Sequence, residues 1–200
     1  GRHQQGLRPD AFGRIHPLGG GVLMAADAKP ASVRIRPAES RDHDAIWSIL
    51  EPVYRAGETY AVDRDITREA ALADWFAAPF SSFVAELEDR VLGVSHVGAN
   101  RPGGGNHIAN ASFATLPAAR GQGVAGALIG HAKAWAREQG FRGMQFNFVV
   151  ATNDDAVHSW KKAGFAVVGR LPGVFLHPTH GYVDALVMYH DLTKGDINEP

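Results

Sequence analysis

The residues best suited to chemistry lie in one short stretch of this chain of 200 residues, from Thr115 to Gly126. It reads T-L-P-A-A-R-G-Q-G-V-A-G, follows an apolar run at 107–116 and precedes a helical pattern at 124–140. A strand, a glycine turn and a helix in that order leave backbone N–H groups free at a helix N-terminus, which carries about half a positive charge. Together with Arg120, such a turn is suited to bind a phosphate or pyrophosphate group.

Two common phosphate-binding motifs fit this turn poorly. The dinucleotide motif G-x-G-x-x-G matches three of its glycines, but in that fold the strand runs directly into the first glycine, whereas here 116–120 intervene. The next expected strand, 144–150, also carries no acid to hold a ribose. The phosphate loop G-x-x-x-x-G-K-[ST] fails because Ala127 and Leu128 stand where Lys and Ser or Thr are required.

A third motif is satisfied, and a second one follows it in the chain. Arg120, Gly123 and Ala125 fit [QR]-x-x-G-x-[GA], with Pro117 ahead of them, and the run 153–165 fits N-x-x-A-x-x-x-[YW]-x-x-x-G-F. In this order and context the two motifs resemble the GNAT superfamily of N-acetyltransferases. The resemblance implies that the turn binds the pyrophosphate of acyl-CoA.

The resemblance also implies acetyl-CoA as the acyl donor and no metal. In the superfamily the two parallel strands before and after the phosphate helix splay apart, and the pantetheine arm pairs with the backbone of the first strand, as an added strand would. The residues thereby implied to contact the donor are Phe113, Ala114, Thr115, Arg120, Gly121, Gln122, Gly123, Val124, Ala125, Asn153 and Trp160.

Two departures from the superfamily concern acid and base catalysis. Most relatives have a tyrosine, the proton donor to the departing thiolate, where this chain has Trp160, whose indole N–H does not ionise usefully. We expect Trp160 to pack or to contact pantetheine. Many relatives use a glutamate of the central strands, yet no Asp or Glu occurs between Asp89 and Glu138. The expected strands carry amides instead, and we take Asn110 and Asn147 as candidate catalytic residues.

Two interpretations of these asparagines remain open. In one, Asn110 and Asn147 orient the acceptor amine or polarise the thioester carbonyl. In the other, they tie the splayed strands together, because an amide is costly to bury without a partner.

Longer runs narrow the resemblance to one branch of the superfamily. The runs H-I-A-N-A-S-F, M-Q-F-N-F-V-V-A-T-N and G-R-L-P-G-V-F-L-H-P are similar to a branch that includes a yeast N-acetyltransferase of the proline analogue azetidine-2-carboxylate. The similarity covers 82–190 and implies a cyclic secondary amino acid as acceptor. In that branch the asparagines matching Asn110, Asn147 and Asn153 are functional.

The acceptor side is defined less sharply. In acetyltransferases of this type the first two helices and their joining loop shape the acceptor pocket, which places Tyr54 and Tyr60 near the substrate, although both could equally be core aromatics. Tyr182 and Asp184 share one face of the closing hairpin and are further candidates. Without an obvious base, the amine loses its proton before binding, to water, or to one of the histidines His96, His107, His158, His177 and His180.

Hydrophobic periodicity and turn residues predict the elements that position these side chains. We expect strands at 33–37, 82–87, 91–100, 107–116, 144–150, 165–171 and 182–191. We expect a helix capped by Ser40 that Pro52 bends or ends, and further helices from Thr67 to about Phe76, at 124–140, and from the cap Asn153 to Gly164. This order predicts an α/β (α+β) fold, with a mixed, mostly antiparallel sheet of about seven strands, helices on both faces and a splay between strands 4 and 5.

Composition limits the function classes and the compartment. The net charge of −1 argues against nucleic-acid and membrane partners, and no apolar run approaches the roughly 20 residues of a membrane span. The absence of cysteine excludes a cysteine acyl intermediate and thiolate metal sites. We expect a cytoplasmic enzyme, with homodimerisation left open.

The domain at 32–194 is expected to be flanked by an extension at 1–31 and a tail at 195–200. The opening Gly1, in place of Met, is consistent with part of the extension being an added segment.

We therefore expect direct transfer of acetyl from acetyl-CoA to the amine of a small molecule, with no covalent intermediate. Two alternatives stand beside this prediction: acetylation of a protein or peptide, and a non-catalytic acyl-CoA sensor.

Overall fold

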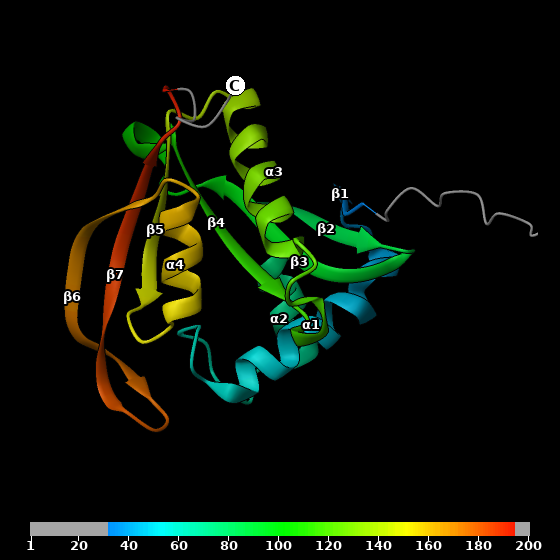
Figure 1. Cartoon of the computed structure of the whole chain (residues 1–200), viewed down its shortest axis with the longest axis horizontal. Coiled ribbons are helices and arrows are strands. Elements are labelled where there is room, and N and C mark those ends of the chain that lie inside the picture. The colour runs from blue at the N-terminus through cyan, green and yellow to red at the C-terminus, as the bar shows by residue number, and fades with distance from the viewer. Residues whose placement is uncertain (1–31, 195–200) are drawn as a thin grey trace, which may run out of the picture. The chain divides into compact units, whose positions relative to one another are not determined.

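The computed structural model describes residues 32–194, so the expected extension at 1–31 and tail at 195–200 lie outside the described residues (Figure 1). The elements in chain order are β1 (Arg34–Pro37), the 3-10 turn η1 (Ser40–Asp42), α1 (His43–Ala56), α2 (Arg68–Trp75), β2 (Ser81–Leu87), β3 (Arg90–Ala99), η2 (Gly103–Gly105), β4 (Ile108–Thr115), η3 (Pro117–Ala119), α3 (Val124–Glu138), β5 (Gly143–Val150), α4 (Asp154–Lys162), β6 (Ala166–His177) and β7 (Gly181–Asp191). Among these residues no helix is both long and apolar enough to cross a bilayer.

The strands form one mixed sheet of seven, in the order β1-β2-β3-β4-β5-β7-β6. Every neighbouring pair is antiparallel except β4 and β5, which run parallel. The crossover between these two strands is made by α3, as a parallel pair requires. The predicted fold class and strand number are confirmed.

The parallel pair is joined at one end only. Within the described residues, β4 and β5 pair at Ile108 with Gly143 and at Ala109 with Met144, and no further pair follows. Beyond these positions the two strands diverge, and α4 lies over the widening gap between them (Figure 1). This is the predicted splay, and it leaves the outer edge of β4 without a strand partner.

Helices cover both faces of the sheet, as predicted. On one face Ile46 and Leu50 of α1 and Trp75 of α2 pack against Val84 and Val94 of the sheet. On the other face α3 buries a stripe of side chains at helical spacing, formed by Val124, Leu128, Ala132 and Ala136. Two separate apolar layers thus hold the sheet in place.

Two predicted helix caps are confirmed. Thr67 Oγ1 accepts a hydrogen bond from the Ala70 N–H at 3.2 Å and so begins α2. Asn153 Oδ1 accepts from the Ala156 N–H at 3.2 Å and so begins α4. Each side chain satisfies a backbone donor that has no partner inside its helix.

The prediction that Ser40 caps the first helix is wrong. Ser40 begins the 3-10 turn, and Asp42 is the residue at the start of α1. Arg36 and Asp42 form an ion pair at 2.7 Å, which fixes this entry in the part-buried wall of the domain. Pro52 does not end the helix, which continues to Ala56. Pro52 has no N–H to donate to the carbonyl of the preceding turn. Because Pro52 lies on the exposed face of the helix, water can donate a hydrogen bond to that carbonyl instead.

The predicted strand at 165–171 is too short, since β6 extends from Ala166 to His177. Pro172 and Gly173 suggest an end to the strand, but the register with β7 shifts between Leu171 and Phe175 and takes up the extra residues. Pairing with β7 then resumes. A bulge therefore accommodates a proline that a regular ladder would exclude.

Candidate active site

The turn before α3 adopts a backbone conformation that only glycine takes readily. Gly121 and Gly123 have φ angles of 79° and 77°, in the left-handed region. A Cβ on either residue would meet no atom within 4 Å, so backbone conformation and not crowding is the reason for glycine here. Gly123 is also the residue immediately before α3.

The N-terminus of α3 presents unpaired donors. The first hydrogen bond of the helix runs from the Ala127 N–H to the Gly123 carbonyl at 2.9 Å. The N–H groups of Val124, Ala125 and Gly126 come before it and have no backbone acceptor within the described residues. No acidic residue occupies the first turn of α3, so its positive end is not neutralised.

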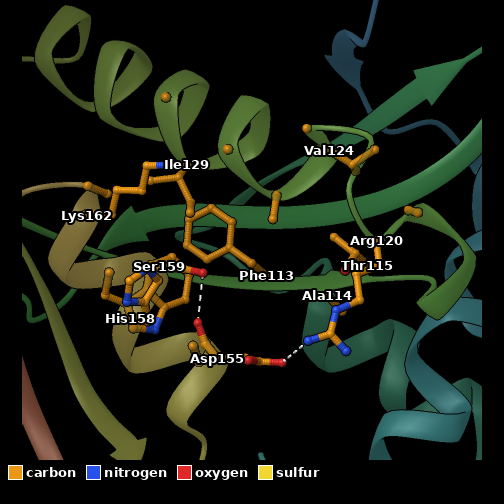
Figure 2. A pocket seen from close by; sticks show the side chains of 18 of the residues that line it. Phe113, Ala114, Thr115, Arg120, Val124, Ile129, Asp155, His158, Ser159 and Lys162 are labelled. Atoms are coloured by element: carbon orange, nitrogen blue, oxygen red, sulfur yellow. Dashed lines mark hydrogen bonds and ion pairs between the residues drawn. The ribbon is translucent and has the colours of Figure 1, made fainter.

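A cavity of about 980 Å³ opens beside this turn, between β4, α3 and α4. We call it the splay cavity. Figure 2 shows Phe113 entering it from β4, Val124 and Ile129 from the α3 side, and Ser159 and Lys162 from the α4 side. Gly126 and Gly130 line it one helical turn apart, and a Cβ at either would meet no atom within 4 Å. The two glycines therefore keep this side of α3 open.

One ion pair spans the mouth of the splay cavity. Arg120 of the turn reaches Asp155 of α4, with Nη2 and Oδ2 2.8 Å apart (Figure 2). The two side chains are 83% and 81% exposed, so the pair is worth at most about 1 kcal/mol. Arg120 is therefore available to an anion that offers a stronger contact.

Aromatic rings close the inner end of the splay cavity. The Trp160 ring lies 5.1 Å from that of Phe113 and 4.7 Å from that of Phe146, and Phe146 stacks on Phe165 at 4.3 Å. Trp160 thus packs between α4 and the two diverging strands. Its position agrees with the expected packing role.

The free edge of β4 is satisfied by side chains. The Ala111 N–H donates to Oδ1 of the neighbouring Asn110 at 2.8 Å. The Tyr60 hydroxyl, from the loop between α1 and α2, donates to the Phe113 carbonyl at 2.5 Å and accepts from the Phe113 N–H at 3.2 Å. Burial raises the pKa of Tyr60, and nearby Tyr54 adds to the effect, so the hydroxyl stays protonated.

Three amides meet on the α1 and α2 side of the sheet, and we call them the amide cluster. Asn147 Nδ2 donates to Asn100 Oδ1 at 2.6 Å, and Asn100 Nδ2 donates back to Asn147 Oδ1 at 3.2 Å. Gln145 Nε2 adds a third hydrogen bond to Asn147 Oδ1 at 2.8 Å. Both polar atoms of Asn147 are therefore engaged, as expected if this residue ties the strands together.

Comparison with known proteins decides the family. Residues 43–165 match the acetyltransferase (GNAT) family. The chain belongs to that family. As a GNAT N-acetyltransferase it is an enzyme and uses acetyl-CoA as its acyl donor.

Individual relatives agree with this assignment. The chain is 29% identical over 152 residues to the N-acetyltransferase aca1 of Schizosaccharomyces pombe, a match that covers 67% of this chain and 73% of the relative. A solved GCN5-related N-acetyltransferase from Kribbella flavida is 43% identical, with a TM-score of 0.77, and covers 80% of this chain and 98% of its own. A phosphinothricin acetyltransferase from Sinorhizobium meliloti, solved with acetyl-CoA, is 22% identical with a TM-score of 0.71 over 84% of this chain and 93% of its own, and shows the same fold.

Most residues that the GNAT resemblance assigns to the donor line the splay cavity. They are Phe113, Ala114, Thr115, Arg120, Gly121, Gly123, Val124, Ala125 and Trp160. The remaining two do not line it. Gln122 folds back so that Nε2 donates to the Ala118 carbonyl at 2.7 Å, and Asn153 caps α4.

The GNAT acceptor candidates are dispersed. Tyr54 of α1 is buried in the core, where burial raises its pKa to about 12. Tyr182 is 77% exposed on β7. Asp184 accepts hydrogen bonds from Arg170 at 2.6 Å and from the Gly173 N–H, which lower its pKa and make it a poor base. Only Tyr60 reaches the edge of β4.

The candidate histidines occupy unlike environments. His96 stacks between Trp75 and Phe80, with ring centroids 4.3 and 4.5 Å away, and burial lowers its pKa. The rings of His177 and His180 lie 4.5 Å apart at the β6–β7 turn. His158 lines the splay cavity from α4, and His107 lies exposed just before β4. The geometry brings none of these imidazoles to Asn110 or Phe113 through a hydrogen bond within residues 32–194.

Several residues that line the splay cavity were not among the predicted donor contacts. The splay cavity is also lined by Gly126, Gly130 and Lys133 of α3 and by Asp155, Ser159 and Lys162 of α4. In each helix these residues are four and then three positions apart, which is the spacing of one helix face. That spacing, with two glycines and a lysine on α3 and polar residues on α4, was the available signal. Asn100 gave no such signal, because its partner Asn147 lies 47 positions away.

Proposed function

We propose that this enzyme transfers acetyl directly from acetyl-CoA to the amine of a small molecule, and that the acceptor is a cyclic secondary amino acid similar to proline. The donor half of the proposal rests on the α3 N-terminus. Its free N–H groups and Arg120 suit a pyrophosphate, and the splay cavity has room for an extended arm. The pantetheine arm would then follow the free edge of β4.

The acceptor half rests on one observation: the α1 and α2 side of β4 and β5 carries amides and no carboxylate. Beside the amide cluster lies Asn110, whose Oδ1 is held by the Ala111 N–H. Within the described residues the Asn110 Nδ2 group has no hydrogen-bond partner. Asn110 is thus poised to donate to an oxygen at the splay, whereas Asn147 is held by its neighbours.

The absence of carboxylates shapes the proposed chemistry. No Asp or Glu occurs from Arg90 to Arg137, so no anion on β3, β4 or α3 up to that point would hold the acceptor as an ammonium ion. A neutral amine attacks the thioester carbonyl carbon, the C–S bond breaks, and the amine proton passes to water while the thiolate leaves. A thiol pKa near 8.5 makes that thiolate a tolerable leaving group without a tyrosine at the place of Trp160. Proximity and amide donors supply the remaining acceleration.

The acceptor class is also supported by the runs H-I-A-N-A-S-F and M-Q-F-N-F-V-V-A-T-N, which resemble the branch with the azetidine-2-carboxylate enzyme. Both runs lie on the strands that flank the splay, β4 and β5. These two runs therefore fall on the strands along which the donor is proposed to lie, whereas the third run, G-R-L-P-G-V-F-L-H-P, lies on β6.

The test is thiol release from acetyl-CoA across a panel of free amino acids, proline analogues, polyamines and short peptides. Turnover on cyclic secondary amines, above that on primary amino acids, is the expected result. Turnover on peptides alone would replace this proposal with protein acetylation. Binding of acetyl-CoA without turnover on any amine would replace it with the sensor function.

A further inference from the structure

The Tyr60 hydroxyl occupies the open edge of β4. In an antiparallel pair the N–H and C=O of one residue point toward the same neighbouring strand. Phe113 lies opposite Ser95 of β3, yet both of its main-chain groups bond to Tyr60. These groups therefore face away from β3, toward the side on which β5 has diverged.

Without Tyr60 this edge would be left unpaired in a partly buried position. A buried main-chain N–H or C=O without a partner is costly, and β5 is too far away to serve Phe113 after the splay begins. Asn110 supplies the acceptor for the Ala111 N–H, two residues earlier. Two side chains, Asn110 and Tyr60, thus accept hydrogen bonds from two successive N–H groups at the β4 edge.

We propose that Tyr60 is a positioning residue whose hydroxyl holds the Phe113 main-chain groups in the ligand-free enzyme and is exchanged for the pantetheine arm when acetyl-CoA binds. The inference rests on the proposed path of the donor along β4. It adds a competition between the Tyr60 side chain and acetyl-CoA for the N–H and C=O of Phe113.

The exchange is expected because the Phe113 N–H is one hydrogen-bond donor for which two acceptors compete, the Tyr60 hydroxyl and the pantetheine arm. The Phe113 N–H serves one acceptor well, and at 3.2 Å the Tyr60 oxygen already occupies it. An incoming main-chain-like arm must displace this oxygen in order to pair with Phe113. Tyr60 belongs to the loop between α1 and α2, and its ring meets the buried Tyr54 ring edge-on at 5.8 Å. Donor binding therefore repositions a side chain of the loop assigned to the acceptor pocket.

The decisive variant is Tyr60→Phe, which keeps the ring and removes the competing hydroxyl. Because the ligand-free state loses a hydrogen-bonded partner and the donor complex does not, the Kd for acetyl-CoA should fall about fivefold by calorimetry. Tyr189→Phe is the matched control, since Tyr189 on β7 covers Gly143 and lies outside the splay cavity. Its Kd should equal that of the parent protein.

Thermal unfolding provides a second readout. The Tyr60→Phe variant should melt below the parent protein without ligand, and saturating acetyl-CoA should narrow that difference. A tyrosine with a merely structural role would lower both melting temperatures equally and leave the Kd unchanged. An unchanged or higher Kd for Tyr60→Phe would overturn the inference.

A separate variant tests the path of the donor itself. Gly126→Leu places a side chain in the open space of the splay cavity, and Ala134→Leu places the same side chain on the exposed face of α3. Loss of acetyl-CoA binding in Gly126→Leu alone supports the path. If Gly126→Leu binds as well as Ala134→Leu, the path is wrong and the Tyr60 inference falls with it. If Gly126→Leu loses binding but Tyr60→Phe does not tighten it, the Tyr60 inference alone fails.

Discussion

Asn147 on β5 and Asn100 at the end of β3 exchange two amide hydrogen bonds, of 2.6 and 3.2 Å, although β4 lies between their strands in the sheet. The pair therefore reaches over β4 on the α1 and α2 side. It lies near the end where β4 and β5 still pair, at Ala109 and Met144. Its position suits a clamp at the closed end of the splay.

This clamp predicts a shared effect on stability. Asn147→Ala and Asn100→Ala should each lower the free energy of unfolding by about 1–3 kcal/mol, because each leaves at least one polar atom of the other amide without a partner. The double variant should lose less than the sum, with a coupling of at least about 0.5 kcal/mol. Urea unfolding measures all three variants. Additive losses would show that the two amides act independently.

Asn110 should behave differently from Asn147. If its Nδ2 group donates to the developing oxyanion, Asn110→Ala should lower kcat by about 10²- to 10³-fold with little change in KM for acetyl-CoA. Asn110→Asp keeps an oxygen for the Ala111 N–H and removes the donor, so it should be equally slow. Ser112→Ala, on the same strand, is the control. Full turnover in Asn110→Ala would rule out this role.

The ion pair at the mouth of the splay cavity predicts opposite effects for its two partners. Arg120→Gln should raise the Kd for acetyl-CoA about 10- to 100-fold, because a charged contact to phosphate is lost. Asp155→Asn should lower that Kd by up to about fivefold, because it frees Arg120 from an exposed pair. Both effects should shrink in high salt. A raised Kd in Asp155→Asn would contradict the competition.

His96 predicts a loss of stability in mild acid. Burial between Trp75 and Phe80 lowers its pKa, and the bond of Nδ1 to the Trp75 carbonyl only partly opposes this. The unfolded chain therefore binds the proton first, so the stabilisation is complete above pH 6.5 and is lost as the pH falls toward the folded value. Partly buried His131 acts with the same sign, because desolvation also lowers its pKa.

Urea unfolding between pH 7.5 and pH 5 measures this effect, with each histidine contributing a slope of at most about 1.4 kcal/mol per pH unit. His96→Phe should flatten the dependence of the free energy of unfolding on pH. Equal slopes in the parent protein and His96→Phe would show that His96 does not carry the effect.

The elements that the sequence predicted well are those set by local signals. Thr67 and Asn153 each bond to the backbone three residues ahead, and the glycines at 121 and 123 match a turn that only they can form. Periodicity located α3, whose buried stripe repeats every three to four residues. These features depend on neighbours along the chain, so one sequence suffices to find them.

The features that escaped prediction depend on contacts between distant residues. Tyr60 and Phe113 are 53 positions apart, and no local pattern links them. Pro52 is tolerated because of the face of α1 on which it lies, and β6 continues past Pro172 because β7 absorbs the shift in register. The hydrogen bonds of Asn147 likewise could not be predicted, because its partner Asn100 is 47 positions away in the sequence.

The splay has a mechanical consequence. Within the described residues only two residue pairs join β4 to β5, so the sheet is in effect a four-stranded sheet and a three-stranded sheet hinged at one end. A small rotation about that hinge would widen or narrow the gap without breaking any other strand pairing. A ligand that lay along β4 and contacted α4 would connect the two halves of the sheet. The rotation between them would then be smaller in the ligand-bound protein than in the free one.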